Sequence, residues 1–284
     1  MNVLITGKNS FVGNYVGPYL VDKGHDVDYI SLKDSHGLEQ DFSNYDVILH
    51  VAGIAHVSYK LKDKDVYDDI NHRLTQKVAI KAKKDGVKQF IFLSSMIVYH
   101  PKEQKISEKT QPNPKGPYAL SKLNAEKALE ELISDDFNVA ILRPSMIYGP
   151  GNKGNIPRLV KLIRKIPLFP WFNNQRSFLF VGNLAEAIQQ IIINNNTGIF
   201  HLADEDAIST TELVEAMGKQ LNKKVWFTRL FNPIIYMCRP WMMTFQKLFG
   251  DYYYDSALIR HKFNYHRYSW DEAMKMTLEG EHHG

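Results

Sequence analysis

Tyr118 and Lys122 form a pair with a clear chemical use, because a spacing of four residues places both side chains on one face of a helix. The segment Tyr118-Ala-Leu-Ser-Lys122 opens a run of helix-forming residues. A phenol with a pKa of about 10 is a poor base at neutral pH, and a neighbouring ammonium group favours its ionised form. The pair therefore predicts a tyrosine that carries a proton to and from a substrate oxygen. The same spacing also occurs on ordinary exposed helices, so other residues must support this interpretation.

Ser94 and Ser95 give that support. They follow the apolar run Phe90-Ile-Phe-Leu93, which is typical of a buried strand. In a parallel sheet the carboxyl ends of the strands form the ligand-binding edge. A serine hydroxyl at this edge can hydrogen-bond the substrate oxygen that Tyr118 protonates or deprotonates.

The segment Thr6-Gly-Lys-Asn-Ser-Phe-Val-Gly13 follows the first apolar run and opens another predicted helix. A turn with little side-chain bulk lets backbone N–H groups approach a pyrophosphate, and the helix N-terminus adds a favourable dipole. Gly7 suits the tight turn, and Gly13 suits a close approach of helix and sheet. Within the helix, Gly17-Pro18 should cause a bend or an early end.

Ser31 and Lys33 come at the end of the next strand candidate. Enzymes that prefer NAD usually place Asp or Glu there, where it accepts hydrogen bonds from the ribose hydroxyls. A hydroxyl and an ammonium group fit a 2′-phosphate better than a carboxylate does, so these residues slightly favour NADP(H) over NAD(H). The alternative is that Lys33 is only a solvated surface charge.

The elements that carry these residues alternate regularly through the first half of the chain. Apolar runs of strand character occur at residues 3–5, 27–32, 47–51, 90–93 and 139–142. Helical patterns, such as those at residues 71–84 and 119–132, lie between the later runs. This rhythm predicts an α/β fold of the Rossmann type, a doubly wound parallel sheet with helices on both faces.

The alternation is lost after Tyr148-Gly-Pro-Gly151, where proline, asparagine and aromatic residues become frequent. We predict an NAD(P)-binding Rossmann domain over residues 1–150 and a smaller substrate-binding lobe over residues 151–284. Residues 177–203 are expected to return toward the sheet, through the apolar runs at 178–181 and 199–202.

The composition excludes several classes of protein. The 284 residues are 44% hydrophobic and 23% charged, which is ordinary for a globular chain. The net charge of +4 comes from basic residues scattered among acidic ones, so nucleic acid is not expected as a partner, whereas a local site for an anionic ligand is. The single cysteine, Cys238, excludes an internal disulfide framework and argues against a Cys-based zinc site, and no metal site is predicted.

The N-terminus runs straight into a strand without a signal peptide, so we expect a cytoplasmic protein. No apolar run approaches the roughly 18 residues needed to span a bilayer. Residues 226–249 are rich in aromatic and apolar side chains, with Arg229, Arg239 and Lys247 interleaved. A membrane-surface helix is conceivable there, but packing within the C-terminal lobe is the favoured interpretation.

Taken in order, these segments resemble the extended short-chain dehydrogenase/reductases, the group that includes UDP-galactose 4-epimerases and nucleotide-sugar dehydratases and reductases. The most specific match is Pro117-Tyr-Ala-Leu-Ser-Lys-Leu-Asn-Ala-Glu126, which resembles the family pattern P-Y-x-x-S-K-x-x-x-E. Residues 6–13 resemble T-G-x-x-G-F-x-G, residues 50–55 resemble H-x-A-A/G-x-x, residues 94–99 resemble S-S-x-x-V-Y, and residues 143–150 resemble R-P-x-x-x-Y-G-P. The resemblance covers nearly the whole chain.

The resemblance implies roles for individual residues. The catalytic group is Ser95, Tyr118 and Lys122, with Ser95 chosen over Ser94 by counting back from Val98-Tyr99. Asn155 and Arg176 fall where the family binds the diphosphate of the nucleotide-sugar, and Ser95 is the third residue expected to bind substrate. Arginine suits this role because a guanidinium engages phosphate oxygens bidentately. The expected cofactor-binding residues are Gly7, Ser10, Phe11, Val12, Gly13, Ser31, Lys33, Ala52, Gly53, Asn71, Tyr118, Lys122 and Pro144. Family members often dimerise through the helices at residues 71–84 and 118–132, so the resemblance also implies a homodimer.

The chain departs from the family pattern in four places. Ser10 replaces the middle glycine of the turn, and Asn183 stands where an aspartate is common. The interval between Leu32 and Tyr45 is too short for the usual third strand and helix, so this edge of the sheet should be abbreviated. A second, C-terminal arginine for the diphosphate is not identifiable.

The function that the resemblance implies is an NAD(P)-dependent nucleotide-sugar epimerase or 4-keto-sugar reductase, with a UDP-hexose type of substrate. Tyr118 would transfer the proton while hydride passes between the sugar carbon and the nicotinamide. A dehydratase fits less well, because such enzymes carry an acidic pair where this chain has Met96-Ile97. The alternative from another class is a catalytically silent NAD(P)-binding regulatory or scaffold protein of the same fold.

Overall fold

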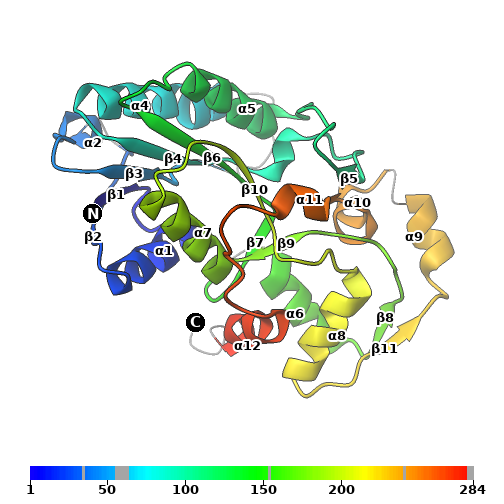
Figure 1. Cartoon of the computed structure of the whole chain (residues 1–284). Coiled ribbons are helices and arrows are strands. Elements are labelled where there is room, and N and C mark those ends of the chain that lie inside the picture. The colour runs from blue at the N-terminus through cyan, green and yellow to red at the C-terminus, as the bar shows by residue number, and fades with distance from the viewer. Residues whose placement is uncertain (34–35, 55–63, 153–154, 239–240, 280–284) are drawn as a thin grey trace.

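The computed structural model describes residues 1–33, 36–54, 64–152, 155–238 and 241–279 (Figure 1). A parallel sheet of six strands lies at its centre, in the order β10-β6-β4-β3-β1-β2. The strands are β1 (Asn2–Thr6), β2 (Asp26–Ile30), β3 (Val47–His50), β4 (Gln89–Leu93), β6 (Asn138–Pro144) and β10 (Gly198–Leu202). Every pairing in this sheet is parallel, so the carboxyl ends of the strands meet at one edge.

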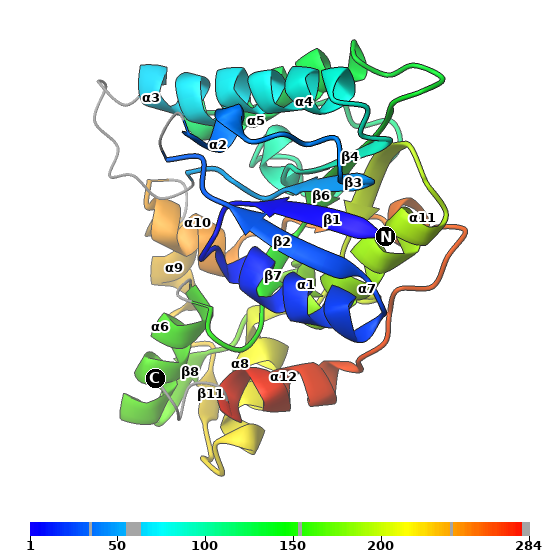
Figure 2. The same cartoon turned by 90° about the vertical axis from the view of Figure 1, so that its left-hand side faces the viewer.

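Helices cover both faces of this sheet (Figure 2). α1 (Phe11–Asp22) and α7 (Val181–Ile193) pack on one face, through a core that includes Leu20 and Ile188. α4 (Leu74–Lys84) and α5 (Pro117–Glu130) pack on the other face, through a core that includes Val78 and Leu129. A short helix, α3 (Lys64–Asp68), leads into α4 through a π-helical turn, η2 (Asp69–Arg73). The predicted doubly wound α/β fold is confirmed.

All five strand candidates from the sequence fall in the central sheet. Between β2 and β3 the described residues form only the four-residue helix α2 (His36–Glu39), so β2 is an edge strand and the predicted abbreviation of this edge is confirmed. The expectation of an early end to α1 is wrong, because α1 continues through Pro18 to Asp22. Packing of its buried face outweighs the lost backbone hydrogen bond. Gly17 allows that packing, since a Cβ there would lie 1.6 Å from the hydroxyl of Tyr29.

A second hydrophobic core lies beside the sheet and includes Val160, Phe180, Met217 and Met274. The elements around it, which we call the C-terminal lobe, are β7 (Met146–Tyr148), α6 (Asn155–Lys165), β8 (Leu168–Pro170), β9 (Phe178–Phe180), α8 (Thr210–Gln220), β11 (Trp226–Thr228), α9 (Asn232–Cys238), α10 (Met243–Phe249) and α12 (Trp270–Glu279). Residues 177–203 were expected to return toward the central sheet. Within them, β10 joins this sheet and α7 covers one of its faces. β9 instead pairs with β7 in a separate two-stranded sheet. No described helix is both long enough and apolar enough to cross a membrane.

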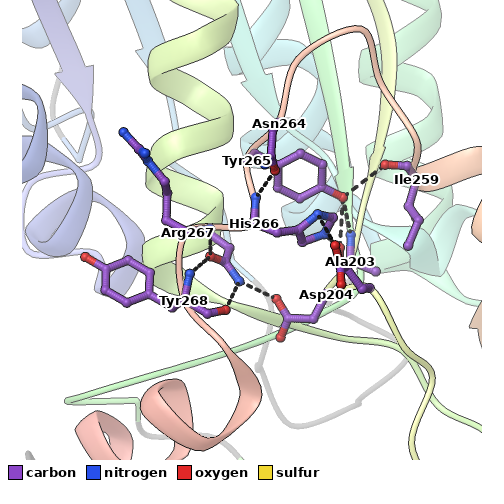
Figure 3. A network of polar contacts seen from close by, with 10 residues as sticks. Ala203, Asp204, Ile259, Asn264, Tyr265, His266, Arg267 and Tyr268 are labelled. Atoms are coloured by element: carbon purple, nitrogen blue, oxygen red, sulfur yellow. Dashed lines mark hydrogen bonds and ion pairs between the residues drawn. The ribbon is translucent and has the colours of Figure 1, made fainter.

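The last part of the chain returns from the lobe to the sheet. β12 (Tyr253–Tyr254) pairs with β5 (Lys105–Ile106), α11 (Ser256–Ile259) follows it, and residues 259–268 then cross the end of β10 (Figure 3). The hydroxyl of Tyr265 donates to the carbonyl of Ala203 over 2.8 Å. These contacts tie the lobe to the carboxyl end of the central sheet.

Asn183 holds the same crossing segment and explains one departure from the family pattern. Its carbonyl oxygen accepts hydrogen bonds from the backbone N–H groups of Arg267 and Tyr268, at 2.9 and 3.0 Å. Its amide nitrogen donates to the carboxylate of Asp204 over 2.9 Å. An aspartate at position 183 could not donate this bond, and it would place a second carboxylate beside the first. Asparagine is therefore the residue that suits this position next to Asp204.

Candidate active site

The three residues predicted to be catalytic lie on two adjacent elements. Ser95 follows β4 and caps a short 3₁₀ helix, η3 (Met96–Val98), by accepting a hydrogen bond from the N–H of Ile97 over 3.3 Å. Tyr118 and Lys122 lie on the first turns of α5, which starts at Pro117 after Gly116 in a left-handed conformation with φ of 92°. The structure thus brings a strand end and a helix start together at the ligand-binding edge of the sheet.

Lys122 is buried at this edge, with 5% of its surface exposed. Its Nζ donates to the carbonyl oxygen of Leu93 over 2.9 Å and lies 4.7 Å from the centre of the Phe92 ring. Burial lowers the pKa of Lys122 to about 8, and the nearby carboxylate of Glu126 opposes this shift. Lys122 therefore remains largely protonated at neutral pH. Its hydrogen bond to Leu93 holds the ammonium group two residues before Ser95 in the sequence.

Tyr118 is half-buried, and its ring centre lies 6.0 Å from that of Tyr67. Burial raises the pKa of Tyr118 to about 12, with a smaller contribution from Tyr67. Within the part of the chain that the structure describes, its hydroxyl forms no hydrogen bond. The expectation that Lys122 lowers this pKa is not met in the protein alone, because the ammonium group is directed at the carbonyl of Leu93 and burial dominates the phenol.

Ser94 and Ser95 have different environments. Ser94 is buried, and its hydroxyl donates to Oε1 of Glu126. Ser95 is partly exposed, and its hydroxyl oxygen accepts the capping hydrogen bond from Ile97, which leaves its proton free for another acceptor. This difference supports Ser95 as the serine that faces a substrate.

A buried ion pair below the site was not singled out from the sequence. Arg143 of β6 contacts Glu126 of α5 through a 2.6 Å bond between Nη2 and Oε2, and its Nη1 donates to the hydroxyl of Tyr99 over 2.7 Å. Both side chains are nearly inaccessible, so each needs the other to offset its loss of hydration. Because Glu126 lies one turn beyond Lys122, this pair anchors the face of α5 that carries Lys122 to the sheet. The signal was present in the sequence, as charged residues at otherwise buried helix and strand positions.

The glycine turn after β1 packs closely against the loop after β3. Gly7 has φ of 96°, and a Cβ there would lie 3.0 Å from the backbone nitrogen of Ala52, so the backbones after β1 and β3 are packed directly against each other. Ser10 caps α1 by accepting the N–H of Gly13 over 3.0 Å, which explains why a serine is accommodated in place of the middle glycine. Phe11 and Val12 form the first turn of the helix, whose N–H groups face this turn.

Gly53 borders both Lys122 and Asn71. A Cβ on Gly53 would lie 2.9 Å from Oδ1 of Asn71 and 3.4 Å from Nζ of Lys122. Asn71 is fully buried, bonds both backbone groups of Ile54 and donates to the hydroxyl of Ser121 over 3.2 Å. Asn71, predicted to bind cofactor, therefore uses its amide to hold the loop after β3 against α5.

The other predicted cofactor residues lie along the same edge. Ser31 and Lys33 follow β2, with Lys33 exposed and its N–H 3.4 Å from the hydroxyl oxygen of Ser31. Pro144 is the buried last residue of β6.

The two residues predicted to contact the substrate diphosphate belong to the C-terminal lobe. Asn155 begins α6, and its side chain lies outside the described part of the structure. Arg176 exchanges backbone hydrogen bonds with Ile208, and its Nη1 donates to the carbonyl of Gly250 over 3.2 Å. Burial lowers the pKa of Arg176 to about 10, and none of the ion pairs between described residues involves it.

Tyr252 connects Arg176 to the segment that follows Ser95. Its backbone bridges to that of Arg176, and its hydroxyl donates to the carbonyl oxygens of Met96 and Tyr99, at 2.7 and 3.1 Å. The segment that starts with Ser95 and the chain at Arg176 are thus held together by one half-buried tyrosine.

Comparison with known proteins agrees with this geometry. The profile of the NAD-dependent epimerase/dehydratase family matches residues 3–203. UDP-glucose 4-epimerase of Vibrio cholerae is 31% identical, over 88% of this chain and 82% of that protein. N-acetyl-α-D-glucosaminyl-diphospho-ditrans,octacis-undecaprenol 4-epimerase of Escherichia coli O157:H7 is 28% identical, over 82% of this chain and 76% of that protein.

Solved structures share the fold over the whole chain. A dTDP-4-dehydrorhamnose reductase from Clostridium acetobutylicum superposes with a TM-score of 0.78 and 18% identity, over 98% of this chain and 99% of that one. UDP-glucuronic acid 4-epimerase from Bacillus cereus superposes with a TM-score of 0.75 and 18% identity, over 100% and 99% of the two chains. The profile match and the Vibrio relative together establish that the chain belongs to the NAD-dependent epimerase/dehydratase family.

Proposed function

We propose that the protein is an NAD(P)-dependent enzyme that epimerises a nucleotide-sugar or reduces its 4-keto form, with Ser95, Tyr118 and Lys122 as the catalytic group. The observation that carries this proposal is the position of Lys122. Its buried ammonium group donates to the carbonyl of Leu93, at the strand end that leads to Ser95, and lies 4.7 Å from the centre of the Phe92 ring. A Cβ on Gly53, after β3, would lie 3.4 Å from it. A buried cation in a structural role would normally have a carboxylate as its direct partner, whereas this one is bonded to a backbone carbonyl at a ligand-binding edge.

The edge fits a dinucleotide. Gly7 and Gly53 lie where a Cβ would collide with neighbouring atoms, so the surface between β1, β3 and α5 is formed by bare backbone. The N-terminus of α1 faces this surface and suits a pyrophosphate, and Lys122 suits the nicotinamide ribose. When bound, the nicotinamide would supply the acceptor and donor of hydride.

Tyr118 would transfer the proton. As a phenolate it takes the proton of a sugar hydroxyl while the C–H bond at the same carbon is broken with loss of hydride, so that a carbonyl forms. Ser95 donates a hydrogen bond to the reacting oxygen throughout. Since the pKa of Tyr118 is about 12 in the protein alone, the ionised form requires positive charge closer to the phenol than Lys122 now provides. An oxidised nicotinamide, if bound at this edge, would supply such a positive charge.

Arg176 would bind a diphosphate. The Vibrio relative is named for a UDP-sugar and the Escherichia coli relative for a sugar on an undecaprenyl diphosphate, and both carriers present a diphosphate next to the sugar. A guanidinium with one N–H bonded to Gly250 retains donors for phosphate oxygens. The hexose nucleotide is the substrate that we propose first.

Two finer points belong to the same proposal. Ser31 and Lys33 at the end of the edge strand favour NADP(H) over NAD(H). Ile80 of α4 and Leu120 of α5 are exposed on neighbouring helices, which supports a homodimer through this helical face.

The experiment that tests the function is turnover of UDP- and dTDP-hexoses and of their 4-keto forms by the purified protein, with NAD(H) and NADP(H) titrated in parallel. Epimerisation would give the C4 epimer without net change in cofactor absorbance, and reduction would consume NADPH in proportion to product. Cofactor binding without turnover of any such sugar would instead favour the silent regulatory or scaffold protein, and this outcome would refute the proposed activity.

A further inference from the structure

Exposed apolar side chains are concentrated in residues 226–242, around α9. Of the 19 large hydrophobic residues that are exposed in the described part of the chain, eight lie in this segment. The six with the highest exposed fractions are all among these eight, from Tyr236 at 55% to Trp241 at 88%. We call the group the α9 patch; it consists of Trp226, Leu230, Phe231, Ile234, Tyr236, Met237, Trp241 and Met242.

The expected packing of residues 226–249 within the lobe is confirmed for only part of this segment. Ile235 and Phe249 are buried in the second core. Asn232 donates to the carbonyl of Trp171 over 2.9 Å, and the ring centres of Tyr236 and Phe172 are 5.1 Å apart. These contacts fix α9 at the margin of the molecule with Ile235 inward (Figure 1). The anchored helix presents Ile234, Tyr236 and Met237, and the other five residues of the patch lie in the segments before and after it.

Charge is segregated around the α9 patch. The chain has 31 acidic residues, yet none lies between Glu215 and Asp251. The same interval contains Lys219, Lys223, Lys224, Arg229, Arg239 and Lys247. Lys224 lies 4.1 Å from the centre of the Trp226 ring, and Arg229 lies 4.1 Å from that of Trp171. No ion pair between described residues involves Lys224, Arg229 or Lys247, so their charge is available to an external anion.

The exposed apolar groups and the surrounding positive charge favour one type of binding partner over another. A second copy of the chain, joined by two-fold symmetry, would bring the same basic and acid-free segment against itself, and the like charges would repel. A bilayer with anionic lipids offers complementary charge to the basic residues and an apolar interior to Leu230, Ile234 and Met237. Tryptophan and tyrosine side chains prefer the level of the lipid headgroups. In the sequence, Trp226 and Trp241 flank these apolar residues, and Tyr236 lies among them.

We infer that the α9 patch docks the C-terminal lobe on the surface of an anionic membrane. α9 has seven residues, far fewer than the roughly 20 that a spanning helix requires, so the helix lies on the bilayer. Apolar side chains supply affinity by leaving water, and basic side chains supply a preference for anionic lipids.

The position of the patch links docking to the candidate substrate site. α10 runs from the patch to Gly250, whose carbonyl accepts hydrogen bonds from both Asn174 and Arg176. A lobe held on a bilayer therefore brings its diphosphate-binding arginine toward the membrane surface, where a lipid-linked diphosphate sugar would be found. This consequence rests on the proposed function, whereas docking itself does not.

Flotation of the full-length protein with vesicles tests the inference. Vesicles of phosphatidylcholine alone are compared with vesicles of phosphatidylcholine mixed with phosphatidylglycerol, at low and high salt. We expect binding to the mixed vesicles, weakened by salt, and a loss of about tenfold or more in bound protein for a triple variant Leu230→Ser, Met237→Ser and Trp241→Ser. A double variant Lys224→Gln and Arg229→Gln should lose the preference for anionic vesicles by a similar factor of about ten.

The matched control is a double variant Val21→Ser and Ile193→Ser, which removes comparably exposed apolar groups from α1 and α7 and should bind vesicles as the unaltered protein does. Absence of binding to anionic vesicles, or equal binding by the triple variant, overturns the inference. So does a fall in oligomeric mass of the triple variant without vesicle binding by the unaltered protein, since the patch would then join protein chains. Thermal unfolding confirms that each variant is folded, and turnover of a water-soluble nucleotide-sugar is a separate readout of the proposed function.

Discussion

The central sheet and the C-terminal lobe organise their functional residues in different ways. In the sheet, the glycine turn, Gly53 and Ser95 follow strands that pair in parallel, and this pairing brings them to one edge. Packing of α5 against the sheet adds Lys122 to the same edge. In the lobe, Arg176 is placed by pairings with residues 208, 250 and 252, which are distant in sequence. Sites of the first kind follow from local motifs and chain order, whereas those of the second kind depend on long-range packing. The two regions should therefore respond differently to substitution.

The largest effect is expected in the sheet region, for Tyr118→Phe. The substitution keeps the ring against Tyr67 and removes the hydroxyl that we propose carries the proton. Turnover should fall by about 10² to 10⁴, while cofactor affinity and thermal stability change little. Steady-state rates with the substrate found in the turnover assay measure this effect. Full activity of the variant would mean that the proton is carried elsewhere, whatever the role of Lys122.

Lys122→Met should reveal the buried charge through the pH dependence of stability. The pKa of Lys122 is about 8 in the folded protein and near its ordinary value of 10.5 when unfolded, so the unfolded chain binds more protons between these values. Stability from this group therefore rises with pH across that window. The unaltered protein should gain roughly 2 kcal/mol relative to the variant between pH 7 and pH 10. Urea unfolding at several pH values measures the difference.

Lys127→Met is the matched control, because Lys127 is exposed on the same helix and should show no such trend. A stability difference between the unaltered protein and Lys122→Met that stays constant with pH would place Lys122 in water rather than at the buried edge of the sheet.

In the lobe, Arg176→Ala should separate the two ligands. Loss of a charge-assisted contact of about 1.5 to 3 kcal/mol should weaken nucleotide-sugar binding about tenfold or more. Cofactor affinity should stay nearly unchanged, because the arginine lies in the other region. Calorimetric titration of both ligands tests this, with the exposed Arg158 of α6 replaced by alanine as a control. If the affinities for nucleotide-sugar and cofactor fell equally, Arg176 would not act on the nucleotide-sugar alone, and the proposed separation of the two regions would be wrong.

The sequence was sufficient for the sheet and insufficient for the lobe, for physical reasons. The strands at residues 3–5, 47–51 and 90–93 are short apolar runs, and their composition predicts that they are buried. The shortened edge of the sheet follows from the short interval before Tyr45. By contrast, the sequence does not predict that Trp241 is exposed, because the residue type alone does not distinguish a buried aromatic side chain from an exposed one. The raised pKa of Tyr118 was also not foreseen, because burial of the phenol dominates it and helical spacing does not reveal burial. The same spacing does not show that the Lys122 ammonium bonds to the carbonyl of Leu93.

The smallest effect is expected at the edge strand, for Lys33→Ala. Lys33 is exposed and close to Ser31, and both follow β2 where the adenosine ribose of a dinucleotide would lie. A solvated ammonium group near a 2′-phosphate contributes only about 1 kcal/mol, so NADP(H) should bind several-fold, roughly three to ten times, more tightly than NAD(H). The variant should lose this preference, whereas Lys88→Ala, at the opposite end of the sheet, should retain it. Raising the salt concentration should erode the preference in the unaltered protein as well, because an exposed charge is screened. Fluorescence titration of both cofactors decides the matter, and an NAD(H) preference in the unaltered protein would leave Lys33 as an ordinary surface charge.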